Sequence, residues 1–413
     1  MVLQNIVDGL IVGSILVLGA IGLTLIYGIR RFPFFAHGEI ITLGAYIALV
    51  FNGAFLTVIA LPPEQLWLAL LLATAVSMTL TALFGIFLEI SIFKRMHGES
   101  LVRPLIASIG LAFVLQNGIR LIFGTSLRNY GLPAQIARVL PFGIRLTDNA
   151  IAILLSAFVL VLGVHIILKY TTLGKAMRAT ADNWDLARVT GIDVQRVIYA
   201  TWVMGAGLAA AAGVLLGLWT IIRPLMGFTQ LLPIFAAVIL GGIGSPYGAM
   251  AGGLLIGVAQ EVSVPFLFSL AEYKVALLPV ALLLATLAGV AFLGWYLLRS
   301  IRDRRSLARV SLVFGGVFAV LAALLLVSFA FFQVDPNAPV AVFFELGLQQ
   351  PAAFKPAIPF MILVLVLLLL PGGLVGLSDK PRFKVFIKVL SNLPKKAVAT
   401  SRSFIGRKMT RSK

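Results

Sequence analysis

The stretch GLIVGSILVLGAIGLTLIYGI, from Gly9 to Ile29, contains no charged residue and decides the class of this chain. A helix rises about 1.5 Å per residue, so a run of about 20 apolar residues spans a bilayer. Similar runs recur along the sequence, without the alternating segments of about ten residues that mark outer-membrane strands. The sequence therefore predicts a polytopic all-α membrane protein.

The composition agrees with a membrane protein. Of the 413 residues, 60% are hydrophobic and 12% are charged, whereas a soluble domain has about a quarter of its residues charged. Lys and Arg number 33 against 15 Asp and Glu, a net charge of +18. Because these basic residues gather in loops and in the tail, they indicate membrane orientation and not nucleic-acid binding. The first residues, MVLQNIVDGL, lack the basic start of a cleavable signal peptide.

Hydropathy predicts about eleven spans. They are expected at Leu10–Tyr27, Ile40–Ala60, Leu66–Phe93, Leu105–Phe123, Ala150–Leu168, Val197–Trp219, Leu225–Ile243, Met250–Leu267, Val275–Leu298, Ser311–Phe332 and Ala357–Leu370. Most Lys and Arg clusters fall on one side, which predicts an N-terminus outside and a C-terminus in the cytoplasm. The loop with Arg128, Arg138 and Arg145 opposes this orientation but is outnumbered.

One connection is long and polar: GKAMRATADNWDLARVTGIDVQ, from Gly174 to Gln195. Its pattern predicts two short helices, Leu173–Ala181 and Asp185–Thr190, with a break at Gly191. Trp184 lies between flanking Arg and Asp residues, an apolar anchor with a charged rim that is typical of a protein interface. A merely solvated loop would not need the apolar residues Trp184, Leu186 and Val189.

Motifs of catalysis, metal binding and cofactor binding are absent from the sequence. It has no G-x-x-x-x-G-K-[ST] loop, so the chain is not expected to hydrolyse ATP itself. It has no G-x-S-x-G elbow and no cysteine, and His37, His97 and His165 lack metal-ligand spacing. We expect no catalytic residue, no metal and no cofactor.

Polar residues within one span suggest a passage for solute. Ser108, Ala112, Gln116 and Arg120 share one face of the predicted helix, and Asn117 is adjacent. A charge deep in the membrane costs at least about 2.5 kcal/mol, so such residues usually face the bundle interior. The alternative is that Arg120 extends to the outer interface while Gln116 bonds a neighbouring helix. The passage is the favoured interpretation.

Two further patterns concern packing and a turn. Gly205, Ala209, Gly213 and Gly217 form a row of small residues that lets helices approach closely. The segment FPFFAHGEI is expected to join the first two spans at the cytoplasmic surface. There the turn residues His37, Gly38 and Glu39 are either a proton-coupling group or, as we favour, a turn at Gly38 with Glu39 starting the next helix beside its dipole.

Several segments together resemble a known family, the membrane permease subunit of bacterial branched-chain amino acid ABC importers, related to urea and amide permeases. The motifs that carry the resemblance are GLIVGSILVLGAIGLTLIYGI, FAHGEIITLGAYIA, IGLAFVLQN, GKAMRATADNWDLARVTGID, VILGGIGSPYGAMAGGLLIG and LLPGGLVG. They occur in the family's order over about residues 3–270 and 355–377. One departure is Phe34, where the family usually has Asn.

The resemblance implies a pore-forming subunit in the bacterial inner membrane. Its expected partners are cytoplasmic ABC ATPase subunits, a homologous second permease and a periplasmic solute-binding protein. The polar segment would contact the ATPase through Arg178, Asp182, Trp184, Asp185, Arg188 and Gly191. The expected pathway residues are Ser14, Gln116, Asn117 and Arg120. The rival is an ion-coupled secondary transporter, which predicts inverted repeats and buried acidic residues, whereas Asp8, Glu89 and Glu261 lie near span ends.

The expected organisation has four regions. Residues 1–270 form the permease core, with the coupling loop at 170–196. Residues 271–353 are an inserted transmembrane hairpin with an outer segment, and residues 354–378 are the terminal transmembrane helix. Residues 379–413 are a basic cytoplasmic tail, whose spacing of apolar residues predicts an amphipathic helix on anionic membrane lipid. Beyond Pro394 a solvated tail is an equal alternative.

Overall fold

The computed structural model describes residues 2–58, 66–96, 102–133, 137–139, 143–272, 275–276, 343–344 and 357–369. Its helices are α1 (Val2–Arg30), α2 (His37–Val58), α3 (Leu66–Ser91), η2 (Phe93–Met96), α4 (Val102–Phe123), α5 (Asp148–Tyr170), α6 (Thr172–Asp182), α7 (Trp184–Val189), α8 (Val194–Trp219), α9 (Met226–Gly241), α10 (Pro246–Glu272) and α13 (Ala357–Leu369). Six of them (α1 to α5 and α8) are long and apolar enough to cross a membrane. The described chain is thus mostly helical, as the sequence predicts.

The chain divides into two units, residues 1–263 with 355–413 and residues 264–354. The first contains an antiparallel pair, β1 (Arg138–Val139) with β2 (Arg145–Leu146). Of the second, the structure describes the end of α10 and the antiparallel pair β3 (Val275–Ala276) with β4 (Phe343–Phe344). The expected spans Val275–Leu298 and Ser311–Phe332 lie almost wholly outside the described residues, and the basic tail 379–413 lies entirely outside them.

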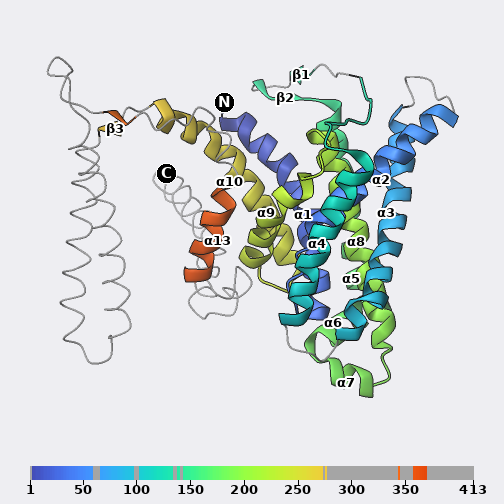
Figure 1. Ribbon diagram of the computed structural model, residues 1–413. Coiled ribbons are helices and arrows are strands. Elements are labelled where there is room, and N and C mark those ends of the chain that lie inside the picture. Colours follow the sequence, from blue (N-terminus) through green and yellow to red (C-terminus); the bar gives the residue numbers. More distant parts are fainter. Residues whose placement is uncertain are drawn as a thin grey trace, which may run out of the picture. The chain divides into compact units, whose positions relative to one another are not determined.

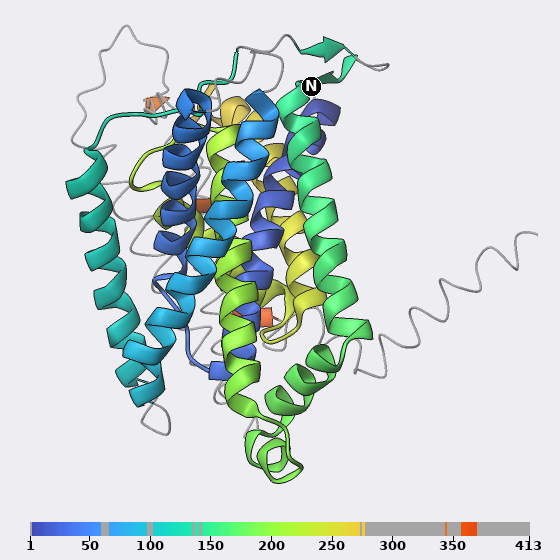
Figure 2. The same ribbon diagram turned by 90° about the vertical axis from the view of Figure 1, so that its right-hand side faces the viewer.

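Helices α1 and α8 form the centre of the first unit (Figures 1 and 2). In both, 83% of the apolar stretch is buried, against 22% in α4 and in α5. Small residues allow this packing, because a Cβ on Gly22 of α1 would lie 2.7 Å from the Gly205 carbonyl oxygen of α8. A Cβ on Gly213 would overlap the carbonyl of Ile41 in α2. The predicted row of small residues in α8 is thus a packing surface.

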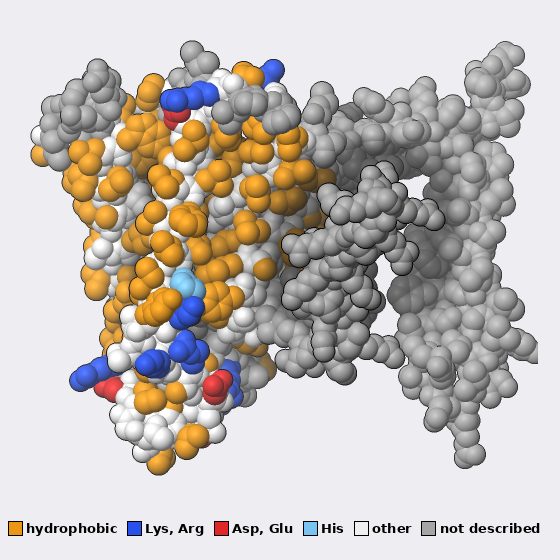
Figure 3. All heavy atoms as spheres, turned by 180° about the vertical axis from the view of Figure 1, so that it is seen from behind, with side chains coloured by type: hydrophobic (Ala, Val, Ile, Leu, Met, Phe, Trp, Pro, Cys, Tyr) orange, Lys and Arg blue, Asp and Glu red, His pale blue; other side chains and the backbone are white. Residues whose placement is uncertain are grey.

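The outer helices present apolar side chains to their surroundings. Ile106 and Phe113 of α4, and Phe158 of α5, are largely exposed. Figure 3 shows a broad hydrophobic surface on one face, with charged side chains gathered at the end where α6 and α7 lie. An exposed apolar surface of this kind fits contact with lipid or with a partner subunit.

Helix α2 begins inside the bundle. The chain turns at Arg31, whose φ is 57°, and returns towards the centre before α2 starts. His37 is fully buried, and its Nε2 lies 2.9 Å from the Gly19 carbonyl oxygen. Gly19 precedes Arg30 by eleven residues (30 − 19), so α2 starts about 16 Å from the end of α1.

This position corrects one expectation from the sequence. His37, Gly38 and Glu39 were expected in a surface turn, and all three are buried. The apolar segment before them, FPFF, is able to enter the bundle, and Phe34 packs edge-on against Trp202 with ring centroids 5.1 Å apart. The interpretation of Glu39 as a residue of the first helical turn is correct, since α2 begins at His37.

Helix α9 also begins inside the bundle. The Gly227 backbone N–H donates to Thr42 Oγ1 of α2 at 3.0 Å. A Cβ on Gly38 would lie 2.8 Å from the Gly227 carbonyl oxygen, so these two backbones touch. The N-termini of α2 and α9 therefore meet in the interior, where their dipoles create a positive local potential.

A buried ion pair joins α1, α3 and α8. Arg30 pairs with Glu89, whose side chain is fully buried, and its Nε donates to Glu89 Oε2 at 3.0 Å. Trp202 Nε1 donates to the same oxygen at 2.7 Å. Phe93 stacks on Trp202 with ring centroids 5.5 Å apart. Both carboxylate oxygens thus have partners in a setting that excludes water.

Candidate functional site

A small hollow lies at the point where the N-termini of α2 and α9 face α4. Its lining residues are Phe35, Glu39, Ile109, Ala112, Phe113, Gln116, Phe228 and Leu231. Six of these eight side chains are apolar, and Phe113 and Phe228 are also exposed at the surface of the chain. We call it the α2–α4–α9 hollow. It combines an apolar wall with two polar groups, which is the usual composition of a small-molecule site.

The two polar groups of the hollow are hydrogen-bonded to each other. Gln116 Nε2 donates to Glu39 Oε1 at 3.2 Å. Glu39 is 1% exposed and Gln116 is 8% exposed. The other carboxylate oxygen, Oε2, is buried and has no hydrogen-bond partner among the described residues. Glu39, which lines the hollow, therefore has one carboxylate oxygen without a hydrogen bond among the described residues.

The structure separates the other expected pathway residues. Arg120 follows Gln116 by one turn of α4, is half-buried, and lies within electrostatic reach of Glu39. Asn117 is exposed and donates to the Phe113 carbonyl of its own helix at 2.8 Å. Ser14 on α1 donates to the Leu10 carbonyl at 2.7 Å. Of the predicted set, Gln116 and Arg120 lie at the hollow or beside it, whereas Ser14 and Asn117 bond within their own helices.

Sequence reasoning missed the partnership of Glu39 with Gln116. The two residues are 77 positions apart and lie on different helices. A signal was present: Glu39 is a carboxylate directly before a long, largely apolar run, and only His37 and Gly38 separate it from the apolar segment FPFFA. Such a carboxylate in a membrane segment is a functional candidate by default.

The polar connection forms two short helices, as the sequence predicts. Thr171 Oγ1 caps α6 by accepting from the Gly174 N–H at 3.1 Å. Asn183 Oδ1 caps α7 by accepting from the Leu186 N–H at 3.0 Å. Gly191, with φ of 87°, ends the pair in a conformation that favours glycine. These caps make α6 and α7 a stiff unit, which we call the coupling segment.

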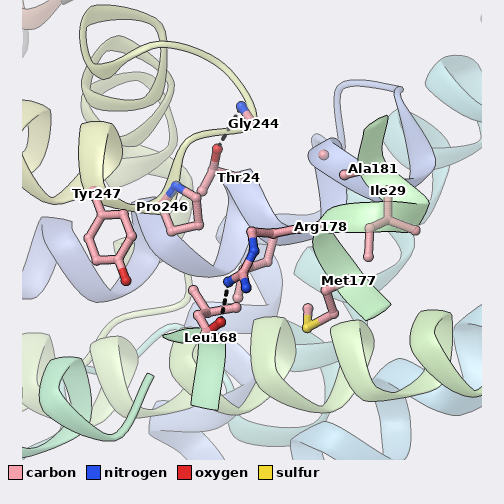
Figure 4. Close-up of a pocket in the computed structure, with 11 residues that line it drawn as sticks. Thr24, Ile29, Leu168, Met177, Arg178, Ala181, Gly244, Pro246 and Tyr247 are labelled. Carbon is pink, nitrogen blue, oxygen red and sulfur yellow. Dashed lines mark hydrogen bonds between the residues drawn. The ribbon is translucent and has the colours of Figure 1, made fainter. Parts of the chain in front are cut away.

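Arginine side chains join the coupling segment to the bundle. Arg31 Nη2 donates to the carbonyls of Ala181 and Asp182, at 2.9 and 3.3 Å. Arg178 of α6 donates to the Leu168 carbonyl at the end of α5, as the dashed line in Figure 4 shows. Arg178 and the backbone of Asp182, two of the expected ATPase contacts, therefore bond within this chain.

A pocket lies between the coupling segment, α1 and the start of α10 (Figure 4). Its lining residues are Thr24, Leu25, Gly28, Ile29, Leu168, Met177, Arg178, Ala181, Gly244, Pro246 and Tyr247. On one side of it the Gly244 N–H donates to Thr24 Oγ1 at 3.0 Å, which ties the turn before α10 to α1. Tyr247 OH lies 3.1 Å from His165 Nδ1 of α5. A displacement of α6 would therefore reach α1, α5 and α10 together.

The tip of the coupling segment exposes both charged and apolar side chains. Asp185 and Arg188 are exposed, and Leu186 and Val189 of α7 are 60% and 84% exposed. Trp184, by contrast, is half-buried and packs against the core of its own chain. The apolar residues free to meet a partner are thus Leu186 and Val189, with Trp184 holding α7 in place.

Comparisons with known proteins place these features in a family. The family described as "Branched-chain amino acid transport system / permease component" matches residues 5–287. The chain is 36% identical over 265 residues to the high-affinity branched-chain amino acid transport system permease protein BraD of Pseudomonas aeruginosa, covering 62% of this chain and 85% of that protein. It is 33% identical to LivH of Escherichia coli K12 over 66% of this chain and 88% of that protein. A probable LivH of Methanocaldococcus jannaschii is 28% identical over 64% and 82%.

Proposed function

The chain belongs to the family of branched-chain amino acid transport permeases, and from this premise we propose that it is the pore-forming membrane subunit of an ATP-driven importer. The solutes are branched-chain amino acids or related small polar molecules, and the location is the bacterial inner membrane. The subunit is a transport component and not an enzyme, so ATP hydrolysis occurs in separate ATPase subunits. An ion-coupled secondary transporter is not favoured, because the relatives are permeases of transport systems with several components.

The observation that carries this proposal is the coupling segment. It is capped at both helices, braced by Arg31 and Arg178, and exposed at Leu186 and Val189. A stiff projection with an apolar tip and a charged rim suits a protein interface. We place the ATPase there, on the cytoplasmic side. This side agrees with the distribution of Lys and Arg and with an N-terminus outside the cytoplasm in a chain of about eleven spans.

The partners on the other faces follow from the same assignment. A homologous second permease would cover the exposed faces of α4 and α9, so that the α2–α4–α9 hollow opens onto a passage between two subunits. A periplasmic binding protein would deliver solute at the end of the bundle where α1 begins. Nucleotide-driven closure of the ATPase pair would push the coupling segment, and Arg31 and Arg178 would pass this movement to α1 and α5.

The first prediction tests the tip of the coupling segment. Arg188→Glu and Val189→Asp are expected to lower co-purification of the ATPase by at least about tenfold and to abolish leucine uptake, since loss of an interface anchor typically costs about 2 kcal/mol or more. The matched control is Arg138→Glu, the same charge reversal in an exposed pair with Asp148 at β1. Trp184→Ala should also reduce uptake, because α7 loses its own support. Wild-type uptake and ATPase binding in the tip variants would contradict the assignment.

The second prediction tests the passage with a cysteine at Gln116. The chain has no cysteine, so an introduced thiol is the only one in this subunit, and labelling is read on this subunit after its separation from the partners. Gln116→Cys should react with a small water-soluble thiol reagent while the assembled transporter hydrolyses ATP, and react slowly when ATP is withheld. Ser77→Cys is the control, because Ser77 is fully buried and bonds the Gly44 carbonyl away from the hollow. Equal protection of both thiols during turnover would place Gln116 in a dry helix contact.

A further inference from the structure

The α2–α4–α9 hollow holds a carboxylate without a cationic partner in contact. The structure describes two buried carboxylates, Glu39 and Glu89. Glu89 is matched by Arg30 and Trp202. Glu39 has one neutral partner, the amide of Gln116, and its Oε2 has no hydrogen bond within the described residues. Burying an ionised group in this way is unfavourable unless another group completes its coordination.

A donor that carries positive charge would complete the coordination of Glu39, because Arg120 is near enough for an electrostatic interaction with this carboxylate but forms no ion pair with it among the described residues. The Gln116 amide already occupies Oε1 and fixes the orientation of the carboxylate. An ammonium group bonded to Oε2 would supply charge and hydrogen bond together, which makes the interaction about twice as strong as a neutral one. Neutral amides offer the hydrogen bond without the charge.

Arg120 is positioned to meet a negative group beside that ammonium. It follows Gln116 by one helical turn, and side chains of a helix lean towards its N-terminus, so Arg120 leans towards Gln116. No side-chain hydrogen bond or ion pair of Arg120 occurs with any described residue. A guanidinium in such a place suits a carboxylate, which it binds through two parallel hydrogen bonds.

The rest of the hollow suits an aliphatic side chain. Its walls come from Phe35, Ile109, Phe113, Phe228 and Leu231, and Phe113 and Phe228 extend the apolar surface outside the hollow. The hollow itself is small, so it would take the polar end of a solute while the branched end lies along α4 and α9. Burial of apolar area there favours aliphatic solutes over urea.

We propose that Glu39, held by Gln116, binds the α-ammonium group of a zwitterionic amino acid in transit, while Arg120 binds its carboxylate. This inference rests on the proposed function and narrows it, since it selects α-amino acids with aliphatic side chains over urea and neutral amides. Glu39 is then the residue that determines specificity inside the membrane.

The test uses the assembled transporter in proteoliposomes, with its ATPases, second permease and binding protein, and radiolabelled leucine as the probe. Glu39→Gln keeps the shape and removes the charge, and should lower leucine uptake at least about tenfold, with partial recovery in Glu39→Asp. Asp148→Asn is the control for loss of a carboxylate charge: Asp148 lies in an exposed pair with Arg138, so this variant should transport at the wild-type rate. Leucine binding to the isolated binding protein checks that the protein that delivers the solute is equally active in every sample.

The outcomes separate the two levels of the proposal. If wild-type transporter takes up leucine and Glu39→Gln does so equally well, the inference is overturned while the proposed function stands. Uptake of urea without leucine by the wild type also overturns the inference and leaves an importer. No ATP-driven uptake of any solute would overturn the function itself. Should Glu39→Gln fail to assemble, Arg120→Gln decides, because Arg120 is only half-buried: a tenfold loss supports the site and wild-type uptake refutes it.

Discussion

Arg30→Met is expected to prevent stable accumulation of the protein in the membrane. The substitution removes the cation that pairs with Glu89 and leaves a fully buried carboxylate with one remaining donor, the indole of Trp202. Breaking a buried pair on one side typically costs about 3–5 kcal/mol, a large part of the stability of most folded proteins. The measurement is the amount of full-length protein in isolated membranes, followed by its thermal unfolding after detergent extraction.

Two further variants separate charge imbalance from lost packing. Arg30→Met combined with Glu89→Leu removes both charges, and we expect it to recover much of the lost accumulation, because apolar replacement of a whole buried pair is often neutral. Arg196→Met is the surface control: its pair with Asp193 is exposed, so the change should be within about 1 kcal/mol. A double variant as unstable as Arg30→Met would show that the instability does not come from an unpaired Glu89 charge, and that the intact ion pair itself stabilises the fold.

Gly213→Ala is expected to be the most disruptive single-methyl change in α8. The added Cβ would occupy the position of the Ile41 carbonyl, so α2 and α8 would have to move apart. The obstacle is backbone and cannot rotate away, which places the cost at or above the upper end of overpacking, about 3 kcal/mol. The expected result is a lowered unfolding temperature in detergent and loss of assembly with the ATPase.

The control for Gly213 is Gly207, six residues earlier on the same helix. A Cβ on Gly207 would meet only the Met78 carbonyl oxygen, at 3.8 Å, which is an ordinary contact. Gly207→Ala should therefore be neutral, or stabilising by up to about 1 kcal/mol through helix propensity. Equal destabilisation by both changes would mean that the close approach at Ile41 is not the cause.

The sequence predicts the parts of this fold that depend on local pattern. Hydropathy locates the six long helices, and the pattern of helix-forming residues with the break at Gly191 locates α6 and α7 to within one or two residues. The sequence could not show that α2 starts inside the bundle, because an apolar segment such as FPFF can lie equally well at a membrane surface or in a protein interior. It also could not orient Trp184, since an aromatic residue on a short amphipathic helix packs equally well against its own chain or a partner.

Long-range pairing was the other part that pattern could not supply. Arg30 and Glu89 are 59 residues apart, and Glu39 and Gln116 are 77 apart. The sequence places Glu89 near a span end and allows Gln116 to bond a neighbouring helix, but it identifies neither partner, because hydropathy ranks residues one at a time and contains no information on which helices are neighbours. The hollow therefore became visible only when α2, α4 and α9 were placed together.

The unbroken length of α1 makes it a lever. Its 29 residues extend about 43 Å, with no proline to absorb bending. Near one end Arg31 bonds the coupling segment, and near the other Gln4 and Asn5 bond the carbonyls of Arg145 and Glu261, at 3.1 and 3.0 Å. Tilting a rod of that length by about 5° shifts its far end by about 4 Å. A small movement of the coupling segment that tilts α1 would therefore displace the other end of this helix by more than the width of a water molecule.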